Sequence, residues 1–196
     1  MTVRYLRSFV TATLAMVLWF PIASSGVELA GTDFPEYVRV EGASRPFKLS
    51  GAGILSRNYV SNFVGALYLP RGEINTDELI AGLHPLRLDL VSRMPNKDAE
   101  QIDTYWRDAF DDAVDDAGIS RRISDKLSKF VALFDGLDQG DRIEILYHPD
   151  SGATISRNGL KLGSTAGIEF NRSLLALFLG AHTPVNSFRD ALLADN

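Results

Sequence analysis

Residues 51–70, with the sequence GAGILSRNYVSNFVGALYLP, constrain the fold of this chain more than any other stretch. The stretch is rich in aromatic and β-branched side chains and contains no acidic residue. That composition is typical of β-strands and suits a segment that is buried in a core. Gly51 and Gly53 indicate a sharp bend or a close approach to the backbone, where a ligand could come near the main chain.

Arg57 carries the one formal charge of this stretch. A guanidinium in a segment suited to burial needs an anionic partner, because an unpaired buried charge is strongly unfavourable. The partner can be a structural carboxylate of the protein, or the head can reach solvent. Alternatively, the partner is the carboxylate of a bound ligand. The sequence leaves these alternatives open.

The first 25 residues have the pattern of an export signal. Arg4 and Arg7 precede an apolar run at residues 9–20, and small residues precede a cleavage site after Ser25. Because the run is short for a bilayer span, we favour cleavage. An uncleaved membrane anchor is the alternative. We therefore expect a periplasmic or secreted chain with no stable membrane span after cleavage.

Residues 26–196 are long enough for one well-packed domain. Removal of the signal takes away two arginines and no acid, so the net charge changes from −5 to −7. This acidity argues against nucleic acid as a partner. The chain has no cysteine, and its three histidines (His84, His148 and His182) lack metal-ligand spacing. We expect neither a metal nor another cofactor.

The order of the predicted elements indicates an α+β domain with a mostly antiparallel sheet and a helical layer on one face. Strands are expected where apolar residues alternate or turn signals follow, at 27–34, 37–41, 47–49, 51–70, 86–92, 142–147 and 153–157. Helices are expected where apolar residues recur every three or four positions, at 76–82, 98–117, 120–135, 170–179 and 185–193. The first two strands are expected to form a hairpin, and the turn pair Asn158-Gly159 predicts another hairpin between 153–157 and a short return strand. Gly118 is expected to end the second helix.

The helix predicted at 98–117 carries an apolar stripe, and acidic residues occupy the remaining positions. A calcium loop would need oxygen ligands at alternate positions around a glycine turn. We interpret the acidic positions as a solvated helix face.

Six short motifs in a fixed order resemble the bacterial chalcone isomerase-like proteins over almost all of residues 26–196. The motifs are Gly-Ala-Gly-aliphatic at 51–54, Ala-Leu-Tyr-Leu-Pro at 66–70, Gly-Asp-Arg at 140–142, Tyr-His-Pro at 147–149 with Gly152, Asn-Gly at 158–159, and Leu-Gly-x-x-x-Pro at 179–184. The resemblance implies a large antiparallel sheet with helices on one side. More remotely, the chain resembles plant chalcone isomerases, which close a chalcone to a flavanone. It also resembles their fatty-acid-binding relatives, which hold a carboxylate through an arginine and a tyrosine.

The chain departs from the pattern of these relatives where a ligand would be held. Leu55 stands where related sequences have the ligand-orienting arginine, and Ser61 and Phe63 stand where a lysine and a tyrosine often occur. Arg57 follows two positions after Leu55, so a regular strand would direct both to the same face, about 6.6 Å apart. The tyrosine, lysine and asparagine of the plant enzymes have no convincing counterpart at 98–110, where Tyr105 is the nearest candidate.

Candidate ligand-binding residues follow from the chemistry of an apolar anion. A guanidinium would bind the carboxylate, a phenol would donate beside it, and apolar side chains would surround the tail. Arg57 and Arg93 are candidates for the cation, and Tyr59, Tyr68 and Tyr105 for the hydroxyl. The tail could lie among Phe63, Leu67, Trp106 and Phe110, each of which is equally explained by core packing.

Three functions remain open from the sequence. The first is a non-catalytic binder of a small apolar carboxylate such as a fatty acid, which we favour because the family motifs are present and the catalytic set is not. The second is an isomerase or intramolecular lyase that acts on an unknown substrate. The third is a periplasmic scaffold that binds a protein partner, which the sequence does not identify, and no small ligand.

Overall fold

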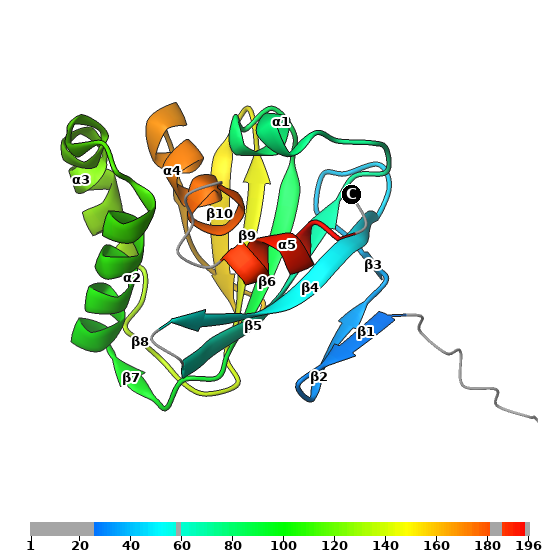
Figure 1. Ribbon diagram of the computed structural model, residues 1–196, viewed down its shortest axis with the longest axis horizontal. Coiled ribbons are helices and arrows are strands. Elements are labelled where there is room, and N and C mark those ends of the chain that lie inside the picture. Colours follow the sequence, from blue (N-terminus) through cyan, green and yellow to red (C-terminus); the bar gives the residue numbers. More distant parts are fainter. Residues whose placement is uncertain (1–25, 58–59, 181–185, 195–196) are drawn as a thin grey trace, which may run out of the picture.

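The computed structural model describes residues 26–57, 60–180 and 186–194, so the predicted export signal, His182 and Tyr59 lie outside the described residues. Its centre is a seven-stranded antiparallel sheet with the strand order β11-β10-β9-β6-β5-β4-β3 (Figure 1). The strands are β3 (Tyr37–Val38), β4 (Phe47–Arg57), β5 (Val60–Leu69), β6 (Leu86–Ser92), β9 (Arg142–His148), β10 (Gly152–Arg157) and β11 (Leu160–Thr165). The predicted central stretch is therefore two paired strands, β4 and β5.

The helices cover one face of this sheet, which confirms the predicted α+β architecture. They are α1 (Thr76–Ile80), α2 (Ala99–Ala113), α3 (Ala117–Val131), α4 (Ile168–Leu179) and α5 (Asn186–Leu192). Phe63 and Leu67 of β5 belong to the same buried cluster as Trp106 of α2 and Phe178 of α4. Because alternate residues of a strand face opposite sides, Val64, Ala66 and Tyr68 lie on the other face.

The other face carries a small hairpin of β1 (Gly26–Leu29) and β2 (Thr32–Pro35), seen opposite α2 and α3 in Figure 1. Ala30 and Gly31 form its turn, with φ of 50° and 73°. The prediction of one strand at 27–34 is therefore wrong, because a tight turn divides it. Phe34 is 1% exposed and packs in the cluster that contains Tyr68.

The boundary between α2 and α3 differs from the prediction. Asp116 is the N-cap of α3, and its carboxylate accepts hydrogen bonds from the backbone N–H groups of Gly118 and Ile119. The prediction that Gly118 ends a helix is wrong, because a capping aspartate starts the next helix two residues earlier. At the other end of α2, Asp98 and Gln101 form a capping box, in agreement with the predicted start. A second small ribbon, β7 (Lys97–Asp98) with β8 (Gly136–Leu137), lies next to this helix start.

The glycines of β4 serve the packing of α5. A Cβ at Gly51 would overlap the backbone carbonyl oxygen of Ala191, and a Cβ at Gly53 would lie 2.9 Å from the Ala191 Cβ. The predicted close approach to this backbone therefore exists, and a helix of the chain itself makes it. Gly51 and Gly53 are thus explained by helix–sheet packing.

Candidate functional site

Arg57 lies at the end of β4, and its guanidinium points at α2 on the helical side of the sheet. Nη2 donates to the backbone oxygen of Asp108 at 3.2 Å, and Nη1 makes a long 3.5 Å contact with the backbone oxygen of Tyr105. Nη2 also forms an ion pair with the carboxylate of Asp112. The Arg57 side chain is 16% exposed, whereas the Asp112 side chain is 49% exposed. The guanidinium is thus a half-buried anion site that a carboxylate of the protein occupies.

Tyr105 lies beside this guanidinium and also packs in the core. The Arg57 Cζ is 5.7 Å from the centre of the Tyr105 ring, which is a cation–π distance. The Tyr105 ring makes edge contacts with Phe63 at 5.8 Å and with Trp106 at 5.4 Å. Burial raises the pKa of the Tyr105 phenol, and the Arg57 charge offsets part of that rise. At neutral pH the phenol is therefore protonated and able to donate a hydrogen bond.

Aromatic side chains fill the predicted tail slot. Phe63, Leu67, Trp106 and Phe110 are each 0–1% exposed. A cavity of about 10 Å³ lies nearby between the sheet and α4, lined only by leucine, isoleucine and phenylalanine side chains. This space holds no acyl chain, so a tail could enter only after helices move away from the sheet. The indole Nε1 of Trp106 has no hydrogen-bond partner among the described residues and is therefore an unpaired buried donor in the predicted tail slot.

The structure separates the other predicted site residues from Arg57. Tyr68 faces the opposite side of the sheet, and Arg93 donates to the backbone oxygen of Ala30 in the β1–β2 turn at 2.9 Å. Arg57 and Tyr105 are thus the two predicted residues that the structure brings together.

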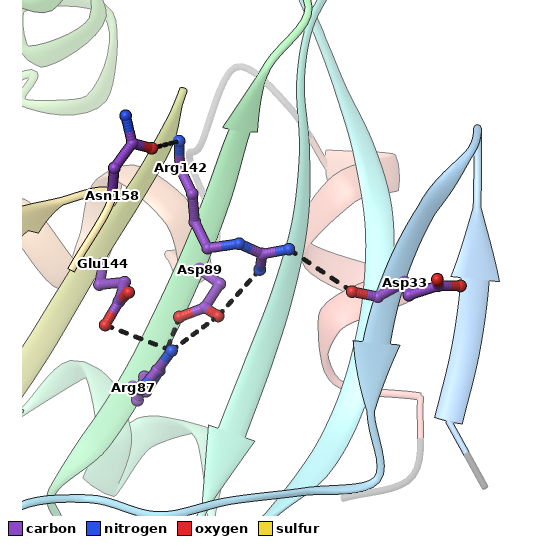
Figure 2. Close-up of polar contacts among 6 residues, drawn as sticks. All are labelled: Asp33, Arg87, Asp89, Arg142, Glu144 and Asn158. Carbon is purple, nitrogen blue, oxygen red and sulfur yellow. Dashed lines mark hydrogen bonds and ion pairs between the residues drawn. The ribbon is translucent and has the colours of Figure 1, made fainter. Parts of the chain in front are cut away.

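A second polar centre lies on the hairpin side of the sheet and centres on Asp89 of β6 (Figure 2). Asp89 is 2% exposed and accepts hydrogen bonds from Arg87 Nε at 2.7 Å, from Arg87 Nη2 at 3.0 Å and from Arg142 Nη1 at 3.1 Å. Arg87 also pairs with Glu144 at 3.3 Å. We call these four residues the outer charge cluster. Two cations and two anions make it neutral.

The outer charge cluster fastens the β1–β2 hairpin to the sheet. In Figure 2 the Arg142 side chain extends towards β2, where its Nη2 makes a 3.5 Å contact with the backbone oxygen of Asp33. Its Cζ lies 5.2 Å from the centre of the Phe34 ring. Burial alone would lower the pKa of Arg87, but its hydrogen bond to Asp89 and the nearby negative charges raise it above the ordinary value. The cluster therefore has a structural role, in which charged side chains hold the hairpin against the sheet.

Tyr68 borders this cluster with an unused hydroxyl. The side chain is 0% exposed, and the hydroxyl has no hydrogen-bond partner among the described residues. Burial is the main cause that raises the pKa of Tyr68, and the negative charge of Asp89 adds to the rise. The phenol therefore stays neutral well above neutral pH.

The outer charge cluster was not predicted from the sequence, although signals for it exist. Arg87 and Asp89 alternate with leucines in a predicted strand, and Arg142 closes the Gly-Asp-Arg motif. Because alternate residues of a strand face opposite sides, Arg87 and Asp89 point to the face away from the helices. The sequence predicted no element that covers this face. The missing information was that a hairpin packs on that face.

Within residues 26–57, 60–180 and 186–194, no helix has the length and apolar character needed to cross a membrane. In the same ranges, no three histidine, aspartate or glutamate side chains are grouped so that they could hold a metal ion.

Comparisons with known proteins identify the family. No functionally curated protein matches the sequence. The crystal structure of a fatty-acid-binding protein from Arabidopsis thaliana has a similar fold, with a TM-score of 0.67, 13% sequence identity, and coverage of 86% of this chain and 95% of that chain. At that identity the similarity concerns the fold alone. A family model described as chalcone isomerase-like matches residues 26–194, in agreement with the motif resemblance. This chain therefore belongs to the chalcone isomerase-like family.

Proposed function

We propose that this protein is a non-catalytic binder of a small apolar anion, with a fatty acid as the model ligand, and that it acts in a periplasm or outside the cell. The observation that carries the proposal is the Arg57 guanidinium, which lies half-buried where the sheet meets α2, next to the Tyr105 ring. The fatty-acid-binding protein from Arabidopsis thaliana, which has a similar fold, supports the ligand class. The export signal pattern supports the compartment.

The ligand carboxylate replaces Asp112 on Arg57. Asp112 is about half exposed, so it can turn fully into solvent, where water replaces the guanidinium as its partner, whereas the guanidinium stays in place. The exchange keeps Arg57 paired, which avoids the penalty of an uncompensated half-buried charge. The Tyr105 ring lies beside the guanidinium, and its neutral phenol donates to the incoming carboxylate once the side chains adjust.

The tail enters the seam between the sheet and α2. Arg57 binds backbone oxygens at two positions of α2 as well as Asp112, so it clamps this helix to the end of β4. When Asp112 leaves, one of these contacts is lost and α2 is held less tightly. Phe63 and Trp106 then repack around an acyl chain, which is an apolar exchange of the kind that buried aromatic side chains permit.

The isomerase hypothesis has less support. Ring closure requires a cation near the attacking oxygen and hydroxyl donors near the enolate. Arg93 is the further candidate for the cation and Tyr68 for the hydroxyl donor, and both lie away from Arg57. The filled seam instead favours the third hypothesis, a scaffold without a small ligand, as the competing function.

A fluorescence titration separates these functions, because Trp106 is the single tryptophan after residue 25. We expect native mass spectrometry of protein purified from its own periplasm to show bound acyl chains. Titration of delipidated protein with a saturated fatty acid should change the Trp106 emission. Arg57→Gln should weaken binding about ten- to hundredfold, as expected for a lost charge-assisted pair. Asp112→Asn, which removes the internal competitor, should tighten it.

The matched control is Arg107→Gln, which removes an α2 arginine whose ion pair with Asp103 is exposed. It should leave the titration unchanged. An empty purified protein, together with no change in emission for the native chain and for Asp112→Asn, would reject the binder and favour the scaffold. Incubation with a chalcone tests the isomerase, since turnover above background would contradict a non-catalytic function.

A further inference from the structure

A groove of about 560 Å³ opens where α1, the α2–α3 connection and α4 meet. Arg57 does not line it, so it is separate from the proposed ligand site. The volume lies within the range of specific binding sites, roughly 300–1,000 Å³. The groove is lined by Asp77, Ile80, Ala81, Ala113, Val114, Asp115, Asp116, Ile119, Arg172, Ser173 and Ala176.

The floor of the groove is apolar. Ile80, Val114 and Ile119 are each only half-buried and present their apolar surface to the groove. Val114 is the C-cap of α2 and has an extended backbone, with φ of −119° and ψ of 91°. The break between α2 and α3 thus leaves apolar side chains uncovered. In a continuous helix, some of these side chains would point in other directions.

The rim of the groove is acidic. Asp77, Asp115 and Asp116 line it, against one cation, Arg172, whose Nε donates to the backbone oxygen of Ala81 at 3.1 Å. Asp77 and Asp115 are exposed and form no ion pair within the described part of the chain. The two backbone N–H groups bound to Asp116 lower the pKa of its carboxyl, so it is ionised at neutral pH. The rim therefore has an excess of two negative charges.

We propose that this groove docks a cationic amphipathic segment of a partner protein. Apolar side chains on one face of such a segment would cover Ile80, Val114 and Ile119, and lysines or arginines beside them would meet Asp77 and Asp115. The acidic rim repels the carboxylate that the Arg57 site would bind, so the two sites select ligands of opposite charge. This complementarity sets the choice of partner and the rate of association more than the affinity.

The probe is a synthetic helical peptide of leucines and lysines in amphipathic order, and its control is the same peptide with glutamate in place of lysine. We expect the lysine peptide alone to bind the exported chain in calorimetry. In methyl NMR spectra it should shift the signals of Ile80 and Ile119. Asp115→Lys should weaken binding about tenfold, a change of about 1.4 kcal/mol.

Asp111→Lys is the matched control, because it makes the same charge change on the exposed face of α2 outside the groove. It should change the affinity less than about twofold. Ile119→Ser should weaken binding, whereas Leu83→Ser, at an exposed leucine outside the groove, should not. Thermal melting confirms that each variant is folded, and Asp115→Asn provides a milder change if Asp115→Lys is not.

Three outcomes would overturn the proposal. They are no binding of the lysine peptide, equal weakening by Asp115→Lys and Asp111→Lys, and methyl shifts confined to residues outside the groove. Equal weakening would show general attraction to an acidic protein. Neither Arg57 nor Trp106 lines the groove, so a fatty-acid titration of Asp115→Lys, read from Trp106, distinguishes failure of this inference from failure of the ligand site.

Discussion

The two faces of the central sheet place charge in opposite ways. On the helical face, the core is aromatic and Arg57 lies at its edge, bound to a carboxylate that is about half exposed. On the hairpin face, the outer charge cluster lies in the middle of the sheet, and its central acid, Asp89, is 2% exposed. The exposure of the acidic partner therefore decides whether an arginine site can exchange its anion.

This difference explains why one site is proposed for a ligand and the other is not. Asp89 accepts bonds from two arginines at once, so no single movement can free it. Removal of this acid leaves Arg142 without an ion pair among the described residues and leaves Arg87 with Glu144 alone. Asp112 has one arginine partner and lies on a solvated helix face. Four substitutions test the comparison, from the largest expected effect to the smallest.

Asp89→Ala should cause the largest loss, about 3–5 kcal/mol in the free energy of unfolding, because Arg87 and Arg142 lose their shared acceptor. Chemical denaturation measures it. The control is Asp135→Ala, which removes an 82% exposed partner of Arg157 and should cost at most about 1 kcal/mol. Similar losses for the two variants would show that the outer charge cluster contributes no more to the free energy of unfolding than a surface ion pair does.

Gly51→Ala should destabilise by about 2–3 kcal/mol, because the new Cβ would overlap the Ala191 carbonyl of α5. Hydrogen exchange should show a loss of protection in α5, while the β1–β2 hairpin on the other face keeps its protection. The control is Ala52→Ser, at the next residue of β4, which packs with the hairpin-side cluster. Equal loss of protection on both faces would show that the two faces are not separate units.

Tyr68→Phe should stabilise the protein by about 1 kcal/mol at neutral pH, because it removes a buried hydroxyl that has no partner in the described part of the chain. The raised pKa of Tyr68 adds a pH dependence. The folded protein holds this proton more tightly than the unfolded chain, so the stability is complete below the unfolded pKa, about 10, and is lost as the pH rises. The variant should lose less stability than the native chain in alkaline melts; an unchanged alkaline profile would contradict this assignment.

Asp116→Asn should have the smallest effect. Asparagine caps helices as well as aspartate does, so the melting temperature at neutral pH should change little. The pKa of Asp116 is lowered by its bonds from Ile119 and Gly118, so its contribution is present above the unfolded pKa and is lost as the pH falls through the folded value. The variant should therefore be less sensitive to acid. Equal acid sensitivity would indicate that the cap charge is irrelevant.

The strand and turn signals predicted most of the fold. Leucines alternate with polar residues at 86–92, and this stretch is β6 at the centre of the sheet. Asn158 and Gly159 predicted a hairpin, and both adopt positive φ, 53° and 79°, between β10 and β11. These signals are local, so a single sequence is sufficient for them.

The errors came from weaker local signals. Ala30 and Gly31 form the first turn, but alanine at positive φ is uncommon and gives no warning. Pro35 favours a break between strands at 27–34 and 37–41, but it ends β2, and the hairpin is formed by β1 and β2. Likewise, Gly118 favours a helix end, whereas Asp116 starts α3.

The site could be predicted only in part, because its partners come from distant segments. The sequence left open whether Arg57 binds a carboxylate of the protein or of a ligand. Asp112, which is 55 residues away, is one of many acids on α2, and no pattern distinguishes it. Tyr105 is a candidate because it is the nearest counterpart of the tyrosine that the plant enzymes carry on this helix, and it lies beside Arg57.

The glycine surface of β4 has a consequence for biogenesis. The helix that covers it, α5, follows every other described element along the chain. The glycine face of β4 therefore stays uncovered until this last helix has emerged from the ribosome. Nascent chains at this stage would be prone to aggregation and would need protection by a chaperone. Truncation before residue 186 should therefore yield insoluble material and not a smaller working domain.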